Sequence, residues 1–331
     1  MELPVSFDDI ESAARQIAPY AHETPLLEFA ELNALAGGRV LLKAEHLQRT
    51  GSFKFRGACN MISRIDAAQA PGGVVAYSSG NHAQGVAEAA RLFGFCAVLI
   101  MPEDAPEIKK RGVISRGGEI VSYDRSSESR EEIAEKITRA RGAVLAPPFE
   151  DERIIAGQGT AGLEMVWQAK ATGARLDALY VPCSGGGLVS GCAIAVKHAH
   201  AQTQVFAVEP EGFEDMRRSL EAGERKRNAT LSGSICDALL APEPGELAFS
   251  ISRHLLDGAI SVSDDEVRYA AGFALRNLKQ VVEPGGAAAL ALVLSGKVDL
   301  KGKVTGIVLS GGNADEAFLT EILASDQASW T

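Results

Sequence analysis

The chain has 331 residues, of which 46% are hydrophobic and 23% are charged, values typical of a soluble globular protein. This length suits one large or two medium domains with a sizeable core. The net charge is −10, the pI is near 5.2 and no run is rich in lysine and arginine. These features argue against a surface for nucleic acid or for an anionic membrane.

The N-terminal segment has no secretory-signal pattern, and no apolar stretch of the sequence reaches membrane-spanning length. The cysteines are odd in number and show no Cys-x-x-Cys spacing, so we expect neither a disulfide framework nor a zinc site. We therefore expect the protein to work in a reducing cytoplasm. The five cysteines are Cys59, Cys96, Cys183, Cys192 and Cys236.

Short β-branched runs alternate with helical patterns along the whole chain. Strands are predicted at 40–44, 74–77, 97–101, 119–122, 178–181, 204–209 and 304–309. Helices are predicted at 81–93, 107–115, 129–140, 157–171, 188–199, 264–278 and 315–324. This rhythm predicts an α/β fold with mostly parallel sheets, and the Pro147-Pro148 pair predicts a crossover between two domains.

The segment 50–58, TGSFKFRGA, places Lys54 near the start of a predicted helix, for which Ser52 is the expected N-cap. The positive end of the helix dipole and the flanking Phe53 and Phe55 disfavour an ammonium ion. They favour the neutral amine that Schiff-base chemistry with a carbonyl cofactor requires. An exposed lysine in an ordinary first turn is the simpler interpretation of these residues alone.

The loop 78–85, SSGNHAQG, follows the predicted strand 74–77 and opens a helix. Its hydroxyl and backbone N–H groups gather where a substrate carboxylate could bind. Ordinary helix capping by Ser79 or Asn81 would account for one of these residues but not for all of them.

The segment 184–187, SGGG, joins a predicted strand to a predicted helix. Its consecutive glycines let backbone N–H groups converge on an anion, for which a phosphate is the natural ligand. A Rossmann pattern fails because Ser190 stands where the third glycine is needed, and no Gly-Lys-Ser/Thr ending follows. A tight turn and a nucleotide-dependent oxidoreductase stay open as alternatives.

The segment 308–313, VLSGGN, also ends a predicted buried strand in a hydroxyl and glycines. Ligands of open α/β sheets bind at such carboxyl ends of strands. Three polar, glycine-rich strand ends therefore favour a common ligand site over three unrelated turns.

A possible metal site follows the predicted strand 204–209. The carboxylates of Glu209 and Asp215, with the backbone carbonyl of Phe213 between them, would suit Mg²⁺ or Ca²⁺, which take oxygen ligands. A solvated acidic turn is the alternative.

Together these motifs resemble the fold-type II pyridoxal phosphate (PLP) enzymes, specifically the threonine/serine dehydratase and serine racemase family. The matching segments, in chain order, are 52–58, 79–85, 155–160, 184–188, 282–284 and 310–313. The resemblance implies two open, mostly parallel twisted sheets flanked by helices, as in the tryptophan synthase β-subunit. It also implies a large PLP-binding domain of residues 1–68 and 152–331 and a small mobile domain of residues 69–151.

The resemblance also implies the roles of individual residues. Lys54 would bind PLP covalently, Asn81 would contact its 3′-oxygen, and Ser310 would face its pyridine nitrogen. The cofactor site would consist of Phe53, Lys54, Asn81, Ser184, Gly185, Gly186, Gly187, Leu188, Glu283 and Ser310. The substrate carboxylate would bind to Ser78, Ser79, Gly80, Asn81 and His82. The family usually has a glycine at position 184, and a serine there still offers its N–H if the position needs no positive φ.

By this resemblance the freed amine of Lys54 removes the α-proton of an amino acid, and a β-hydroxyl leaves. We therefore expect dehydration of L-threonine or L-serine to a 2-oxo acid and ammonia. A serine racemase, in which Ser79 would donate a proton opposite Lys54, and a 3-hydroxyaspartate dehydratase are alternatives on the same scaffold. Glu209, Phe213 and Asp215 fit the divalent-metal site of that subgroup, and a homodimer is usual in the family.

Overall fold

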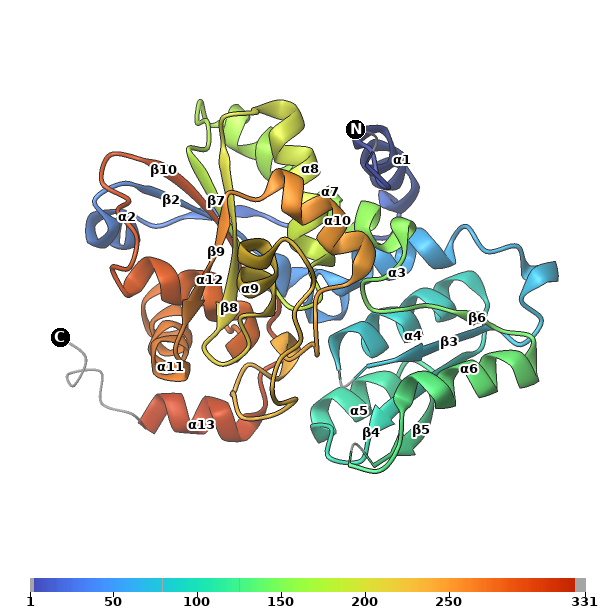
Figure 1. Cartoon of the computed structure of the whole chain (residues 1–331). Coiled ribbons are helices and arrows are strands. Elements are labelled where there is room, and N and C mark those ends of the chain that lie inside the picture. The colour runs from blue at the N-terminus through green and yellow to red at the C-terminus, as the bar shows by residue number, and fades with distance from the viewer. Residues whose placement is uncertain (1–2, 79, 125, 325–331) are drawn as a thin grey trace.

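The computed structural model describes residues 3–78, 80–124 and 126–324, which form two separate β-sheets (Figure 1). The larger sheet has the order β1-β2-β10-β7-β8-β9; the β1–β2 pair is antiparallel and the other pairs are parallel. Its strands are β1 (Leu26–Glu28), β2 (Arg39–Lys43), β7 (Ala178–Pro182), β8 (Gln204–Pro210), β9 (Gly258–Val262) and β10 (Val304–Val308).

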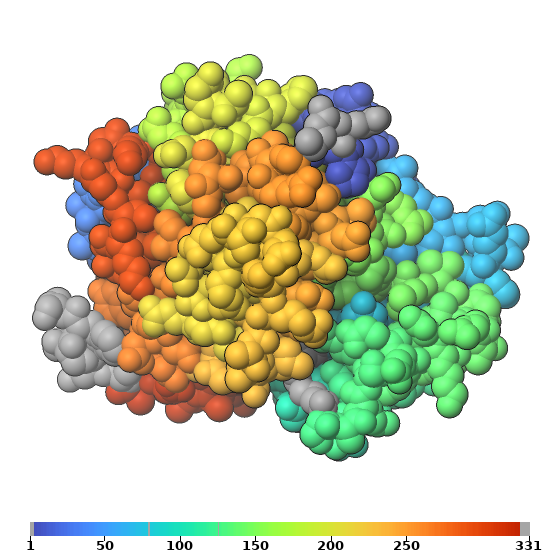
Figure 2. All heavy atoms as spheres, in the orientation of Figure 1, coloured from blue at the N-terminus to red at the C-terminus, as the bar shows by residue number. Residues whose placement is uncertain are grey.

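The second sheet is parallel throughout and has the order β5-β4-β3-β6. Its strands are β3 (Val74–Tyr77), β4 (Ala97–Pro102), β5 (Glu119–Tyr123) and β6 (Val144–Leu145). We refer to residues 74–145 as the four-stranded half and to the rest of the described chain as the six-stranded half. In the space-filling view the four-stranded half, coloured blue-green to green, lies beside yellow and orange segments of the six-stranded half (Figure 2).

Helices cover both sheets (Figure 1). Those of the four-stranded half are α4 (Asn81–Phe93), α5 (Glu107–Ile114) and α6 (Arg130–Arg141). Those of the six-stranded half are α1 (Phe7–Ile17), α2 (Ala30–Ala36), α3 (Lys54–Ile62), α7 (Glu152–Ala171), α8 (Gly187–Ala199), α9 (Asp215–Ala222), α10 (Glu246–Leu255), α11 (Asp264–Phe273), α12 (Pro284–Leu294) and α13 (Glu316–Ala324).

The six-stranded sheet is buried on both faces. In β7, Leu179 and Val181 pack into the core that contains α7 and α8, whereas Ala178 and Tyr180 pack into the core that contains α11 and α12. Successive side chains of a strand point to opposite faces, so a strand covered on both sides is an unbroken apolar run. The predicted strand 178–181 was recognisable in the sequence for this reason.

The structure contains the two mostly parallel sheets that the sequence predicts. The predicted helix 264–278 is present as α11 followed by a π-helical turn, Ala274–Leu278. The sequence did not indicate the short strands β1, β6 and β9, nor the helices α1, α2, α9, α10 and α12. Among the described residues, no helix combines the length and the apolarity that crossing a bilayer needs.

The predicted N-cap role of Ser52 is wrong. Helix α3 begins at Lys54, and the preceding Phe53 provides no side-chain cap. Ser52 is extended, with φ −162° and ψ 159°, because it pairs with Gly311 in a β-bridge beside β10. Its buried hydroxyl has no hydrogen-bond partner among the described residues.

The Pro147-Pro148 pair lies between β6 and α7, where the chain passes from the four-stranded to the six-stranded half. A crossover was predicted at this point. The mobility of residues 69–151 as a separate domain stays a prediction.

Candidate active site

A pocket lies between the two halves, at the carboxyl ends of β3, β7 and β10. It contains most of the residues that the sequence singled out. These are Phe53, Lys54, Ser78, Asn81, His82, Ser184, Gly185, Gly186, Gly187, Leu188 and Ser310. The three polar strand ends therefore meet at one site.

Lys54 is the first residue of α3, and its ammonium donates a hydrogen bond to the Pro148 carbonyl at 2.9 Å. The ammonium also lies 5.2 Å from the centre of the Phe53 ring. The surrounding protein excludes water and thereby lowers the pKa of Lys54 to about 8. About a tenth of the amine is therefore neutral and nucleophilic at pH 7, far more than for an ordinary lysine. Phe55, the other phenylalanine that flanks Lys54 in the sequence, does not line the pocket; it packs into the hydrophobic core under α4.

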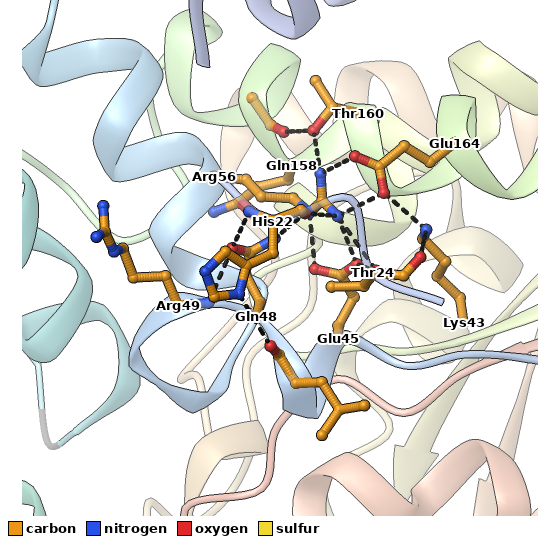
Figure 3. Close-up of polar contacts among 12 residues, drawn as sticks. His22, Thr24, Lys43, Glu45, Gln48, Arg49, Arg56, Gln158, Thr160 and Glu164 are labelled. Carbon is orange, nitrogen blue, oxygen red and sulfur yellow. Dashed lines mark hydrogen bonds and ion pairs between the residues drawn. The ribbon is translucent and has the colours of Figure 1, made fainter. Parts of the chain in front are cut away.

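The helix that carries Lys54 is held by a buried network of charges (Figure 3). Arg56 is fully buried and donates to Glu45 at 2.7 Å and to Glu164 at 2.6 Å. The ammonium of Lys43 donates to the other oxygen of Glu164 at 2.7 Å. A buried arginine is tolerated only when carboxylates pair with it, so the network fixes α3 against β2 and α7.

The loop after β3 begins with Ser78, whose hydroxyl accepts a hydrogen bond from the N–H of Gly80. Ser79, the predicted acid of a racemase, lies outside the described residues. Asn81 opens α4 without a capping contact; its amide donates to Glu283, and its Oδ1 accepts from Asn313 at 2.8 Å. Ordinary helix capping therefore does not explain the Asn81 side chain.

His82 is buried and neutral. Desolvation and the charge of Lys54 lower the pKa of the His82 ring to about 3. Its Nε2 lies 2.9 Å from the carbonyl of Ala146, and a neutral ring must donate its proton there. This leaves Nδ1 as a buried acceptor that has no partner among the described residues.

The glycine loop joins β7 to the first turn of α8, as the sequence predicts. Gly186 has φ 94°, and a Cβ there would lie 2.8 Å from Cε of Met216, so only glycine fits without strain. Ser184 does not have a positive φ, and its hydroxyl accepts a hydrogen bond from the Ala241 N–H at 3.1 Å. The departure from the usual glycine is therefore accommodated.

Ser310 follows β10, and its carbonyl accepts a hydrogen bond from the Phe53 N–H at 3.2 Å. Glu283 precedes α12 and is buried beside Asn81. Its N–H donates to the Gly311 carbonyl at 3.1 Å. Neither Glu283 nor Gly80 lines the pocket directly, but both contact Lys109, which does.

The sequence reasoning missed several residues of the pocket, which are Tyr77, Lys109, Arg130, Phe149 and the segment 237–241. Lys109 and Arg130 lay in predicted helices, and no local pattern distinguished them from surface residues. The Phe149 ring packs directly against the glycine loop, because a Cβ on Gly185 would overlap the ring. Only the tertiary arrangement reveals these contacts.

Two of the predicted metal ligands, Glu209 and Asp215, lie near each other and do not line the pocket. Glu209 and Asp215 are fully buried, and Glu209 accepts from the N–H groups of Met216 at 2.7 Å and Arg217 at 3.0 Å. Desolvation and mutual repulsion raise the pKa of Glu209 to about 8, and desolvation raises that of Asp215 to about 7. Asp215 Oδ2 is buried without a partner among the described residues. Those residues include no group of three or more His, Cys, Asp and Glu side chains that could hold a metal ion, so the cation stays a prediction.

The pocket suits a phosphorylated aldehyde. The glycine loop and the helix N-terminus offer N–H groups to a phosphate, and the amine of Lys54 can react with a carbonyl. The orphaned Nδ1 of His82 is a buried acceptor in the same pocket. These residues therefore fit PLP.

Comparisons with known proteins agree with this fit. Residues 17–311 match the family described as pyridoxal-phosphate dependent enzyme. An L-threo-3-hydroxyaspartate ammonia-lyase of a Pseudomonas species is 40% identical over 310 residues, which span 94% of this chain and 96% of that protein. A serine racemase of Arabidopsis thaliana is 40% identical over 325 residues, 96% of each chain. The crystal structure of a threonine deaminase from T.th. has a TM-score of 0.88 at 44% identity and covers 94% of this chain and 99% of that one. The chain therefore belongs to the family of pyridoxal-phosphate-dependent enzymes.

Proposed function

We propose that the protein catalyses β-elimination from a hydroxy-amino acid and releases a 2-oxo acid and ammonia. The observation that carries this proposal is the position of Lys54, whose amine of lowered pKa shares a pocket with the glycine loop and Ser310. L-Serine and L-threonine are the substrates we expect.

PLP, when bound, supplies an electrophilic carbonyl and an electron sink for the charge that develops at Cα. The N–H groups of residues 184–188 bind the phosphate, and Asn81 orients the ring through its side-chain amide. The hydroxyl of Ser310, being neutral, would not enforce protonation of the pyridine nitrogen. The amine of Lys54, when free, would remove the proton from Cα of the substrate as a general base.

The substrate carboxylate binds to residues 78–82, at the N-terminus of α4, where backbone N–H groups and the helix dipole favour an anion. The β-hydroxyl would then leave as water with the proton that Lys54 took from Cα. Hydrolysis of the remaining enamine returns one water and gives the 2-oxo acid and ammonia.

Racemisation of serine is the second candidate. Ser79 follows β3 in the sequence, and relatives that cover almost the whole chain are serine racemases. A donor at Ser79 opposite Lys54 would return a proton to the other face of Cα. The S79A variant would then lose D-serine formation far more than oxo-acid release, which chiral chromatography measures. Equal losses would limit Ser79 to substrate positioning.

Dehydration of 3-hydroxyaspartate on the same scaffold is the third candidate.

A divalent cation, Mg²⁺ or Ca²⁺, completes the proposal. It would bind to the carboxylates of Glu209 and Asp215 and to the Phe213 carbonyl, all oxygen ligands. The protein would act in the cytoplasm as a homodimer, and residues 69–151 would move as a small domain over the pocket.

The test is a substrate screen with the purified protein loaded with PLP. L-Serine, L-threonine and the stereoisomers of 3-hydroxyaspartate are scored for release of 2-oxo acid. Lys54→Ala must abolish the release while the circular dichroism spectrum stays unchanged, and Lys170→Ala, an exposed residue on α7, serves as the matched control. Turnover by the Lys54 variant, or no oxo acid from any substrate, would refute the proposal.

A further inference from the structure

Lys109 of α5 is a buried cation between the two halves of the protein. Its side chain is 4% exposed, and its ammonium lies 2.6 Å from Asp237 and 3.6 Å from Glu283. Asp237 begins the 3₁₀-helix η4 (Asp237–Leu239), and Glu283 precedes α12, so both carboxylates belong to the six-stranded half. The neighbouring Lys110 instead bonds to Glu103 and Glu107 of its own half.

The aliphatic part of the Lys109 side chain packs against Gly80, in the loop that is proposed to bind the substrate carboxylate. A Cβ on Gly80 would overlap Cδ of Lys109, so a glycine at position 80 leaves room for this lysine. Lys109 thereby touches the loop at residue 80 and reaches Glu283, the partner of Asn81, at its other end.

Glu283 is almost fully buried, and the groups that face it come from three directions. Asn81 of α4 donates to it, Lys109 of α5 lies beside it, and Asp237 with the neighbouring Cys236 faces it from η4. Burial and the negative charge of Asp237 raise the pKa of Glu283, while Lys109 and Asn81 oppose the rise. Burial raises the pKa of Cys236 to about 12, so this thiol stays neutral. The ammonium of Lys109 lies within ion-pair distance of Glu283 Oε2, which has no hydrogen-bond partner among the described residues, and its charge opposes protonation of Glu283.

We propose that Lys109 is a positioning residue, which holds Glu283 ionised and so keeps Asn81 oriented toward the reaction site. This inference rests on the proposed function, because Asn81 is assigned there to the cofactor ring. A charged acceptor binds an amide N–H about twice as strongly as a neutral one. The Lys109–Glu283 pair also joins α5 of the four-stranded half to the start of α12 in the six-stranded half.

Without the ammonium, Glu283 takes up a proton at a higher pH than in the wild type. A protonated Glu283 becomes a weaker acceptor for Asn81. Because Glu283 of the Lys109→Met variant ionises only at a higher pH than in the wild type, this variant should lose activity as the pH falls. Its kcat/KM recovers in alkali.

The experiment compares the PLP-loaded wild type with K109M, K110M, E283Q and the double variant K109M/E283Q. We expect the acid limb of kcat/KM for L-serine to move up by about one pH unit in K109M. K110M, the matched control, should follow the wild type. The double variant should lack the shifted limb, because its amide at position 283 cannot titrate. A K109M profile parallel to the wild type, or an equal shift in the double variant, would overturn the proposal.

Hydrogen–deuterium exchange of peptides from α4 provides a readout that does not depend on turnover. After correction for intrinsic exchange rates, α4 should lose protection at acid pH in K109M and keep it in K110M and K109M/E283Q. If the wild type releases no oxo acid, the proposed function fails, and the exchange data alone decide on Lys109. Unchanged protection in K109M, or the same loss in K109M/E283Q, would contradict its role.

Discussion

Without the divalent cation proposed at Glu209 and Asp215, the stability of this protein should fall as the pH rises. Glu209 and Asp215 are buried, and their pKa values in the folded protein are raised to about 8 and about 7 from ordinary values of 4.5 and 3.8. Below the ordinary values both carboxyls are protonated in the folded and the unfolded chain alike. Above them the unfolded chain ionises first, so the folded state loses stability until the pH passes about 8.

The magnitude follows from 1.36 kcal/mol per pKa unit. For Glu209 the shift corresponds to about 5 kcal/mol, and for Asp215, whose shift comes from its own desolvation, to about 4 kcal/mol, so we expect about 9 kcal/mol for the two together. A protein of this kind has about 5–15 kcal/mol of stability in total. The metal-free protein should therefore unfold easily in mild alkali, and bound Mg²⁺ or Ca²⁺ should restore its stability by mass action.

Urea unfolding of the EDTA-treated PLP-loaded protein, followed between about pH 5 and 8, measures this effect. The double variant E209Q/D215N should lack the pH dependence and the response to the cation. Glu221→Gln, an exposed change on the same helix α9, should retain both. A free energy of unfolding that stays level or rises over this range would refute the reasoning.

Three further predictions concern the frame around the pocket. Arg56→Met leaves the fully buried carboxylate of Glu45 without its ion-pair partner, whereas Glu164 keeps Lys43. Urea unfolding should therefore show a loss of about 3–5 kcal/mol, whereas exposed Arg139→Met should show none. Gly186→Ala forces a side chain into a positive φ, and titration with PLP should show affinity weakened by about 1–3 kcal/mol; unchanged affinity would place the phosphate elsewhere. Ser184→Gly removes the bond to Ala241 but keeps the N–H, so stability should fall by about 1 kcal/mol while PLP affinity holds.

The sequence predicts most of the frame because its signals are local. The β7 strand and the glycine loop are adjacent in the chain, so the apolar run and the residues 184–187 predict a strand, a turn and a helix start. The six motifs suffice to recognise the family, which the comparisons confirm. The oxidoreductase alternative thereby loses its support.

Local signals also mislead where a distant segment decides the conformation. Ser52 has the right residue type for a cap, but its backbone pairs with Gly311, some 260 positions later in the chain, and stays extended. Lys109 and Asp237 are likewise far apart in sequence. The residues around a lysine in a predicted helix do not show which distant carboxylate it will contact, so a single sequence does not predict such pairs.

The charges near Lys54 explain why burial alone lowers its pKa. Arg56, two residues away, is neutralised by Glu45 and Glu164, and Lys109 by Asp237 and Glu283. His82 stays neutral. An unpaired carboxylate beside Lys54 would hold the proton on the ammonium and oppose the release of a free amine. These ion pairs hold the elements around the pocket in place, and their opposite charges largely cancel at the amine nitrogen of Lys54. Removing one carboxylate of a pair should therefore alter the pKa of Lys54 as well as the stability, which the pH dependence of its modification by a carbonyl reagent in the PLP-free protein would reveal.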